Sequence, residues 1–284
     1  MLSYRHAFHA GNLADVHKHA ALAAMLTLLQ RKARGYCYVD THAGVGRYRL
    51  DGDDAGEWRE GVGRVRASAE AAPQALAPYL DCLRRLGDAQ YPGSPWLASQ
   101  LAREQDSALL FELHPQDGKR LKSLFKGDRQ VAVHAPRDAR EGLPALLPLG
   151  TPRGLVLVDP SYERLDEYAE PVRLLITARQ RWATATVVLW YPLLGGPRAG
   201  RHDALLRDVL AQQVPGPILR SELHAKDPAR AGLIGSGLLV ANPPWPFAEQ
   251  WPAVNGWLAG VLAECASAGH TRDDWLVPEA NGGA

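Results

Sequence analysis

Apolar and polar residues follow one another along the chain in blocks that predict strands separated by helices. Short apolar runs predict strands at residues 36–40, 108–112, 130–134, 155–159, 186–191, 218–224 and 237–241. Helical spacing of apolar residues predicts helices at 12–33, 115–125, 165–182 and 248–265. Strands that alternate with helices in this way form a mainly parallel, doubly wound sheet. The sequence therefore predicts the α/β class.

Residues 47–106 interrupt this alternation. They are rich in Arg, Glu and Ala, and predict helices at 73–86 and 96–103, joined by the turn sequence Tyr-Pro-Gly-Ser-Pro. The alternative, a plain connection of this length, is uncommon in compact domains. We therefore expect residues 47–106 to be a helical insertion subdomain. Residues 1–46 and 107–284 would form the sheet domain, with an N-terminal arm and helix at 1–34.

Composition limits the possible classes of protein and partner. The 284 residues are 46% hydrophobic and 22% charged, as in soluble globular proteins. The net charge of +1 means that a nucleic-acid partner would need a local basic patch. The three scattered cysteines indicate a reducing compartment. There is no signal-peptide pattern, and the most apolar run, residues 20–29, is too short to span a bilayer. We expect a cytoplasmic protein, monomeric and without a membrane partner.

The first 34 residues are the most basic segment of the chain. Against the single acid Asp15 stand Arg5, Lys18, Arg31, Lys32 and Arg34. We interpret the segment as a candidate RNA-contacting surface, in which Arg5 and Lys18 bind phosphates. The alternative is an ordinary solvated helix face. Its histidines do not have metal-ligand spacing, because His17 and His19 would point to different sides of a helix, so we expect no metal.

The sequence Asp159-Pro160-Ser161-Tyr162 follows the most strongly predicted buried strand. In open α/β sheets, ligands bind at the carboxyl ends of the strands. A carboxylate and a prolyl carbonyl would accept hydrogen bonds from the exocyclic N6 of an adenine, and an aromatic ring would stack on the extruded base. This pattern therefore favours amine methylation, with Asp159, Pro160 and Tyr162 as catalytic residues. The alternative is a strand-ending turn without chemistry.

Three other predicted strands also end near an acidic residue. Asp40 precedes a Gly-x-Gly turn, Glu112 is placed to hold a ribose diol, and Asp138 is placed near an adenine amino group. Any one of them alone would be read as a solvated turn carboxylate. Together with Asp159 they match a nucleoside cofactor lying across the sheet edge. The Gly-x-Gly turn lacks the third glycine of the dinucleotide-binding fingerprint, which argues against NAD or FAD as the cofactor.

A second tetrapeptide of similar form, Asn242-Pro-Pro-Trp245, lies near the C-terminus. It follows the strands that should complete the sheet, so its position is unsuitable for catalysis. We interpret it as a strand terminator near the site. The alternative is that Asn242 is the catalytic residue.

The motifs together resemble a known family. The segments YRHAFHAGNLADVHKH, VDTHAGVGRY, YPGSP, ELHP, VDPSYE, LWYP and NPPW occur in the same order in the RlmJ-type 23S rRNA (adenine-N6)-methyltransferases. The resemblance covers nearly the whole chain. It implies a Rossmann-like class I methyltransferase that depends on S-adenosylmethionine (SAM). It also implies a single adenine of 23S rRNA as substrate.

The resemblance also assigns roles to residues. The cofactor would be bound by His19, His42, Ser94, Glu112, Asp138, Ala139 and Asp159. Asp159 would be catalytic, and Tyr4 would contact the RNA. The match around Asp138 is weaker, because HAPRDARE departs from the acid-glycine pair usual in the family. Ser161 also replaces the usual second proline of Asp-Pro-Pro-Tyr. We expect this change to affect the rate of methyl transfer and not to abolish the function.

Two kinds of alternative function remain open at this point. The same chemistry on another substrate, a DNA adenine or a protein glutamine, is compatible with the near-neutral charge. A non-catalytic RNA-binding protein with a cofactor-shaped cleft is favoured only by Ser161.

Overall fold

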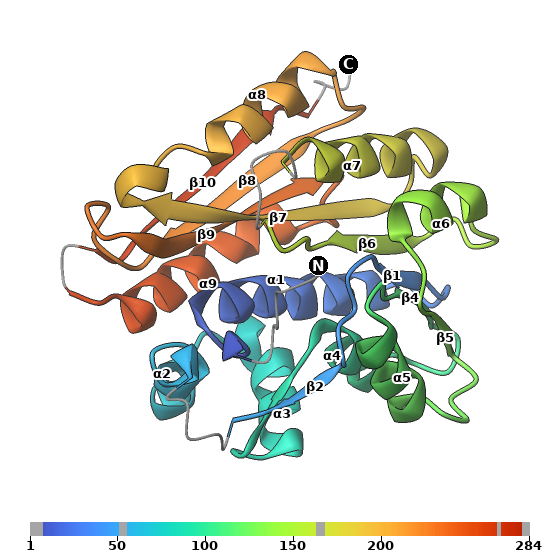
Figure 1. Ribbon diagram of the computed structural model, residues 1–284, viewed down its shortest axis with the longest axis horizontal. Coiled ribbons are helices and arrows are strands. Elements are labelled where there is room, and N and C mark those ends of the chain that lie inside the picture. The colour runs from blue at the N-terminus through green and yellow to red at the C-terminus, as the bar shows by residue number, and fades with distance from the viewer. Residues whose placement is uncertain (1–7, 51–55, 163–167, 266–267, 280–284) are drawn as a thin grey trace.

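The computed structural model describes residues 8–50, 56–162, 168–265 and 268–279, and its centre is an eight-stranded sheet (Figure 1). The strand order is β10-β8-β9-β7-β6-β1-β4-β5. The strands are β1 (Cys37–Asp40), β4 (Ser107–Phe111), β5 (Val131–His134), β6 (Gly154–Val158), β7 (Thr186–Gly195), β8 (Ile218–His224), β9 (Gly232–Ala241) and β10 (His270–Val277). The five strands from β7 to β5 run parallel, while β9 and β10 run antiparallel to their neighbours. The predicted α/β class with a mainly parallel sheet is confirmed.

Helices cover both faces of the sheet (Figure 1). On one face lie α6 (Ala139–Leu146), α7 (Ala169–Arg181) and α8 (His202–Ala211). On the other face lie α1 (Leu13–Gln30) and α9 (Phe247–Leu262), and α5 (Pro115–Leu124) packs beside β5. Outside α1, a further layer contains α2 (Val62–Ala67) and α3 (Ala77–Leu86), whereas α4 (Ser94–Leu101) packs against α1 and against β1 and β4 of the sheet. The α1 helix is therefore sandwiched between the sheet and a second layer of helices.

Strand β6 shows why the sequence forms a sheet buried on both sides. Leu155 and Leu157 point into the core shared with α1, whereas Val156 and Val158 point into the core shared with α7. All four side chains are fully buried. Because successive strand residues face opposite sides, a strand covered on both faces must be apolar without interruption. This is the run from which the strand was predicted.

The burial of α1 differs from that of a surface helix. Asn12 caps the helix, accepting hydrogen bonds at 3.0 Å from the N–H groups of Ala14 and Asp15. Of its 18 residues, 14 are buried. The helix contacts β9 on one side and α3 and α4 on the other. The interpretation of this segment as a solvated or RNA-facing helix surface is therefore wrong for the helix itself.

The region predicted as a helical insertion begins and ends in a short two-stranded ribbon. Strand β2 (Arg47–Arg49) pairs antiparallel with β3 (Gln90–Pro92). Between them lie α2, α3 and the short 3-10 turns Glu57–Arg59, Ala69–Ala71 and Gln74–Leu76. The α4 helix contacts β1, β4 and α1, as the crossover helix of a βαβ unit does. The assignment of residues 47–106 to a separate helical subdomain remains a prediction. Within this range, α4 packs against the sheet.

Some elements were not predicted. Helices α6 and α8 and strand β10 were missed, and β9 begins at Gly232 rather than at 237. Strand β10 is polar along most of its length, because it is an edge strand that pairs only with β8. Edge strands carry charged residues that oppose unwanted pairing, which hides the usual apolar signal.

Candidate active site

The site lies where the chain changes direction across the sheet. From β1 the chain continues outward to β4 and β5, then returns to β6 on the other side of β1. Asp40 at the end of β1 pairs in register with Leu157 of β6, so Asp40 and Asp159 end neighbouring parallel strands. Ligands of open α/β sheets bind at such a switch point, outside the carboxyl ends of the strands.

Asp40 is the most deeply buried acid of this edge. Its carboxylate accepts hydrogen bonds from the hydroxyls of Tyr38 at 2.7 Å and Ser94 at 2.6 Å, and from the His42 N–H at 3.1 Å. Burial raises the pKa of Asp40 to about 6, although the three donors oppose the shift. Two residues expected at the cofactor site, His42 and Ser94, therefore meet at Asp40. The sequence showed Asp40 only as a polar strand end.

The glycine turn after β1 is tied to the end of β4. Gly44 has φ +60°, a conformation that favours glycine, and a Cβ there would collide with the Tyr48 hydroxyl. The Gly44 N–H donates to Glu112 Oε2 at 2.7 Å, and the His114 N–H donates to Oε1 at 2.6 Å. Burial raises the pKa of Glu112 despite these two donors. The turn thus brings the backbone and the Glu112 carboxylate together at the sheet edge.

The other expected cofactor residues have different partners. Asp138 caps α6, accepting from the Arg140 N–H at 2.8 Å, and also pairs with the Arg140 guanidinium at 2.6 Å. Its neighbour Ala139 is buried. His19 is buried as well, with Nδ1 2.8 Å from the Tyr91 hydroxyl. His19 therefore joins α1 to β3, and its predicted cofactor contact remains a prediction, as do those of Asp138 and Ala139.

Asp159, directly after β6, forms an ion pair with α1. Its Oδ2 lies 2.5 Å from Lys18 Nζ, and Lys18 Nζ lies 3.0 Å from Oδ1 of Asp15. The Lys18 side chain is only 4% exposed. Burial alone would lower the pKa of Lys18, but the two carboxylates outweigh burial and raise it. Lys18 is therefore a charged group held between two acids.

This arrangement corrects the predicted role of Lys18. We expected its ammonium to bind RNA phosphate, yet the whole Lys18 side chain is buried and its ammonium lies against Asp159. The same ammonium lies 5.4 Å from the centre of the Trp190 ring, a cation–π contact. The other expected RNA contacts, Tyr4 and Arg5, lie outside the described residues.

Tyr162 differs from its expected role as an open stacking surface. Its side chain is 8% exposed, its hydroxyl donates to the Trp190 carbonyl at 2.7 Å, and its ring packs 4.6 Å from that of Tyr168. The residue has φ +50°, which is unusual for a bulky side chain and is typical of functional sites. Tyr162 is thus packed against Tyr168 and Trp190 and hydrogen-bonded to the Trp190 backbone. Trp190, which is partly exposed, was not singled out from the sequence.

Asn242 lies at the opposite edge of the sheet. Ala241 pairs with Val187 near the start of β7, whereas Val158 pairs with Leu189 further along the same strand. The Asn242 N–H donates to the Pro217 carbonyl at 2.9 Å. The expectation of a strand terminator is confirmed, but the expectation that it lies near the site is wrong. The antiparallel direction of β9 places its carboxyl end away from that of β6.

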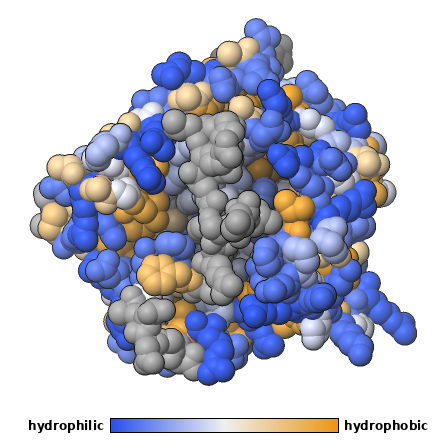
Figure 2. Space-filling view, viewed as in Figure 1, coloured by the Kyte–Doolittle hydropathy of each residue, from blue (hydrophilic) through white to orange (hydrophobic). Residues whose placement is uncertain are grey.

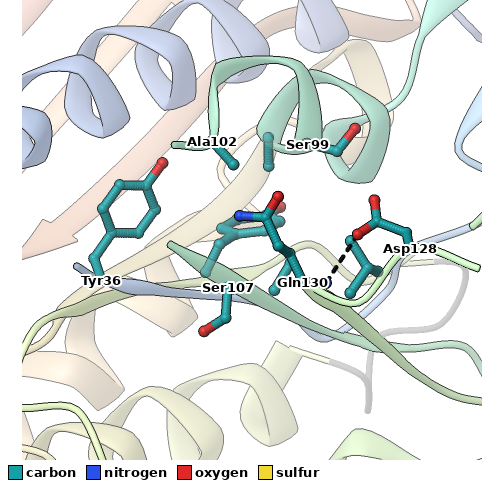
Figure 3. Close-up of a pocket in the computed structure, with 10 residues that line it drawn as sticks. Tyr36, Ser99, Ala102, Ser107, Asp128 and Gln130 are labelled. Atoms are coloured by element: carbon teal, nitrogen blue, oxygen red, sulfur yellow. Dashed lines mark hydrogen bonds between the residues drawn. The ribbon is translucent and has the colours of Figure 1, made fainter. Parts of the chain in front are cut away.

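A small hollow at that opposite edge is unsuitable for a cofactor. It lies between α4 and the amino ends of β1, β4 and β5, and Tyr36 and Gln130 are among its lining residues (Figure 3). Its volume is about 10 Å³, which is about the space of one water molecule. The candidate site therefore remains at the carboxyl edge of the parallel strands. On the face seen in Figure 2, hydrophilic side chains of the described residues alternate with smaller hydrophobic patches.

Neither a metal-binding cluster nor a membrane-spanning helix is found in the described part of the chain. His, Cys, Asp and Glu side chains there form no group of three or more that would hold a metal ion. No helix within residues 8–50, 56–162, 168–265 and 268–279 combines the length and apolar character needed to cross a membrane.

The fold and the site define a class of protein. A Rossmann-like sheet whose switch point carries buried carboxylates, a glycine turn and a strand-ending Asp-Pro is a nucleotide-cofactor enzyme of the methyltransferase type. Residues 33–277 match the family described as ribosomal RNA large subunit methyltransferase D, RlmJ. The chain belongs to this family.

Individual relatives agree with this assignment. The chain is 39% identical to ribosomal RNA large subunit methyltransferase J of Escherichia coli, across 98% of this chain and 100% of the relative. It is 37% identical to the protein of the same name from Haemophilus influenzae, with the same coverage. The crystal structure of protein LPL1258 from Legionella pneumophila has TM-score 0.85 and 31% identity, covering 96% of this chain and 99% of that one. The predicted family, fold class and SAM-dependent methyltransferase activity are confirmed.

Proposed function

We propose that the protein transfers the methyl group of SAM to N6 of a specific adenine in 23S rRNA, at the switch point between β1 and β6. The observation that carries this proposal is the position of Asp159. Lys18 occupies its Oδ2, and no other side chain or backbone group of the described residues bonds to Oδ1. Oδ1 is therefore available to accept a hydrogen bond from a base. Asp159 is only partly exposed, so such a bond forms in a partly dry site.

The acceptor groups at the sheet edge suit SAM. Ribose hydroxyls would donate to Glu112, whose two oxygens already accept one N–H each and have lone pairs left. The adenine amino group of the cofactor would be near Asp138, and His42 and Ser94, which bond to Asp40, would lie beside the cofactor. The cofactor supplies a methyl group on a sulfonium, so the leaving group is a neutral thioether and needs no acid.

The reaction then depends on making N6 nucleophilic. In a flipped adenine, Asp159 Oδ1 and the Pro160 carbonyl would accept the two N6 hydrogens and hold the nitrogen in line with the methyl carbon. The C–N bond forms as the C–S bond breaks, and the C–S electron pair stays on sulfur. The N6 proton leaves to Asp159 or to water. Positive charge that develops on N6 is stabilised by the Asp159 carboxylate, which Lys18 keeps in a fixed orientation.

The substrate is tested by supplying radiolabelled SAM with unmodified 23S rRNA, double-stranded DNA or a bacterial protein extract. We expect label only in the rRNA. Label in DNA or protein would show that the substrate is not rRNA. No transfer to any of the three would favour a non-catalytic RNA-binding protein, the alternative that Ser161 suggested. We also propose a cytoplasmic monomer, in keeping with this substrate.

Glu112→Gln should weaken SAM binding by on the order of tenfold, because the amide loses one strong acceptor for the ribose hydroxyls. Calorimetry with SAM alone measures this effect. The Asp117→Asn variant is a suitable control, because Asp117 lies in the first turn of α5, near the same edge, and pairs with Arg120. Equal affinity in wild type and Glu112→Gln would remove Glu112 from the cofactor site.

The N-terminal residues should contribute to RNA affinity. Arg5→Ala should weaken RNA binding and lower the slope of log K against log salt by about one, because one phosphate contact is lost. Tyr4→Ala should cost about 1–3 kcal/mol if its ring stacks on a base. Titrations of an rRNA fragment at several salt concentrations measure both effects. Unchanged slopes and affinities would show that these residues do not contact RNA.

A further inference from the structure

Trp190, in β7, lies beside Asp159 at the carboxyl edge of the sheet. Val158 of β6 pairs with Leu189 of β7, and the next residues along the two segments are Asp159 and Trp190. Successive side chains of a strand face opposite sides of the sheet. The side chains of Asp159 and Trp190 both contact the Lys18 ammonium, so both face α1. The proposed mechanism uses Asp159 but leaves Trp190 without a role.

Three buried residues hold Trp190 in place. Its indole N–H donates to Ser236 Oγ at 3.0 Å, and Ser236 is fully buried. The Trp190 carbonyl accepts from the Tyr162 hydroxyl at 2.7 Å, and the centres of the two rings lie 5.6 Å apart. The Lys18 ammonium lies 5.4 Å from the centre of the Trp190 ring. Trp190 is nevertheless partly exposed, so part of it is left uncovered by these three residues.

A buried histidine supports Ser236 from within α1. His17 is fully buried, with Nδ1 2.9 Å from Ser236 Oγ and Nε2 3.4 Å from Ser221 Oγ. Burial lowers the pKa of His17 to about 3, so the imidazole is neutral near pH 7. The Trp251 indole also donates to Ser221 Oγ, at 2.7 Å. The indole of Trp190 is thus attached to a chain of hydrogen bonds that continues into the core.

Trp190 has the two properties that a base-stacking ring needs, an accessible part and a fixed orientation. Tyr162 was expected to stack on the extruded base, but it is only 8% exposed and its ring packs between those of Tyr168 and Trp190. The Trp190 ring is more accessible, and the bond to Ser236 fixes its rotation. The neighbouring tryptophan therefore suits the role better than the motif tyrosine.

We propose that Trp190 is the stacking surface for the target adenine, and that Ser236 and His17 are positioning residues that fix its ring. The inference rests on the proposed function for the identity of the base. A base stacked on the indole would be held while Asp159 and the Pro160 carbonyl accept its N6 hydrogens. Stacking tolerates any base, so Trp190 holds the base, while Asp159 and Pro160 recognise its amino group.

Single-turnover methylation of unmodified 23S rRNA, at saturating SAM and limiting RNA, measures the contribution of the ring. Trp190→Leu keeps an apolar side chain without an aromatic face and should lower the rate by about tenfold, as loss of one base–aromatic stack does. Trp190→Phe keeps a smaller face and should stay within about threefold of wild type. Ser236→Ala keeps the indole but removes its acceptor, and should lower the rate by about threefold. SAM affinity, measured by calorimetry, should stay within about twofold in all three variants.

Tryptophan fluorescence tests the contact itself. Binding of rRNA in the presence of S-adenosylhomocysteine, which has no methyl group to transfer, should quench part of the wild-type fluorescence because a base stacks on an indole. Trp190→Phe should lose this part of the quenching. Trp245→Phe is the matched control, because Trp245 is 78% exposed and follows Asn242 at the opposite edge of the sheet. It should keep both the quenching and the wild-type rate.

The inference is overturned if Trp190→Leu methylates rRNA as fast as wild type, or if Trp190→Phe shows the same quenching as wild type. A loss of SAM affinity in parallel with the rate would also overturn it, since Trp190 would then only support the fold of the site. If Trp190→Leu does not fold, the fluorescence of Trp190→Phe still decides. Failure of the proposed function is a separate result, because the wild type itself would then form no N6-methyladenosine in rRNA.

Discussion

Asp159→Ala should lower kcat by about 100-fold or more while SAM affinity stays within a few-fold of wild type. The carboxylate acts on N6 as charge develops there, so its loss should affect the transition state more than cofactor binding. Single-turnover methylation at saturating SAM and rRNA measures the first effect, and calorimetry measures the second.

Asn242 offers a matched control, since it belongs to the other tetrapeptide of similar form. Its φ of +54° suits glycine, so Asn242→Gly removes the side chain without backbone strain. Among the described residues, the side-chain amide of Asn242 donates to the Thr184 and Ala185 carbonyls, at the edge away from Asp159. We expect a rate within about twofold of wild type, since the variant removes no group at the site. If Asn242→Gly abolished transfer and Asp159→Ala did not, the assignment of the two motifs would be reversed.

Lys18→Met should lower the free energy of unfolding by about 3–5 kcal/mol, because it leaves the buried Asp15 carboxylate and the partly exposed Asp159 carboxylate without their shared cation. Methionine fills a similar volume, so the lost charge dominates over lost packing. Urea denaturation monitored by circular dichroism gives the change in free energy.

A second variant separates charge from packing in that result. Combining Lys18→Met with Asp15→Asn removes one of the two carboxylates that lose Lys18 and should recover part of the lost stability. If Lys18→Met unfolded at the same urea concentration as wild type, the three groups would not form a stabilising network. If the double variant were less stable than Lys18→Met, packing rather than charge would explain the loss.

Much of the fold could be predicted because the sheet is buried on both faces. The run from Leu155 to Val158 is apolar without a break, and the residue after it had to stand at the sheet edge. The order of strand ends then placed Asp40, Glu112 and Asp159 on one edge, as the structure shows. Strand β10 escaped detection because only one of its sides pairs, and polar residues are tolerated there.

The environment of α1 could not be read from its own sequence. Charged residues on a helix normally indicate a solvated face, and only the outer layer of helices shows that Lys18 is enclosed. The spacing of Asp15 and Lys18 was a signal of an ion pair within the helix, but it gave no sign of the partner Asp159, which is 141 residues away in sequence. Long-range pairing of this kind depends on strand order, which local patterns do not specify.

Tyr162 and Asn242 show the same limit in another form. Both residues follow a strand, and both have a positive φ, so their local backbone conformations are similar. Their positions differ because β6 runs parallel to β7 while β9 runs antiparallel to it. Strand direction therefore decides which of the two motifs lies at the carboxyl edge of the parallel strands.

Nucleoside analysis of the reaction product tests the central claim most directly. Unmodified 23S rRNA is incubated with the protein and SAM, digested to nucleosides and examined by mass spectrometry. The proposed mechanism predicts N6-methyladenosine, at about one per rRNA molecule because a single flipped adenine is accepted. A methyl group found only on another base, on another atom of adenine or on ribose would contradict the account.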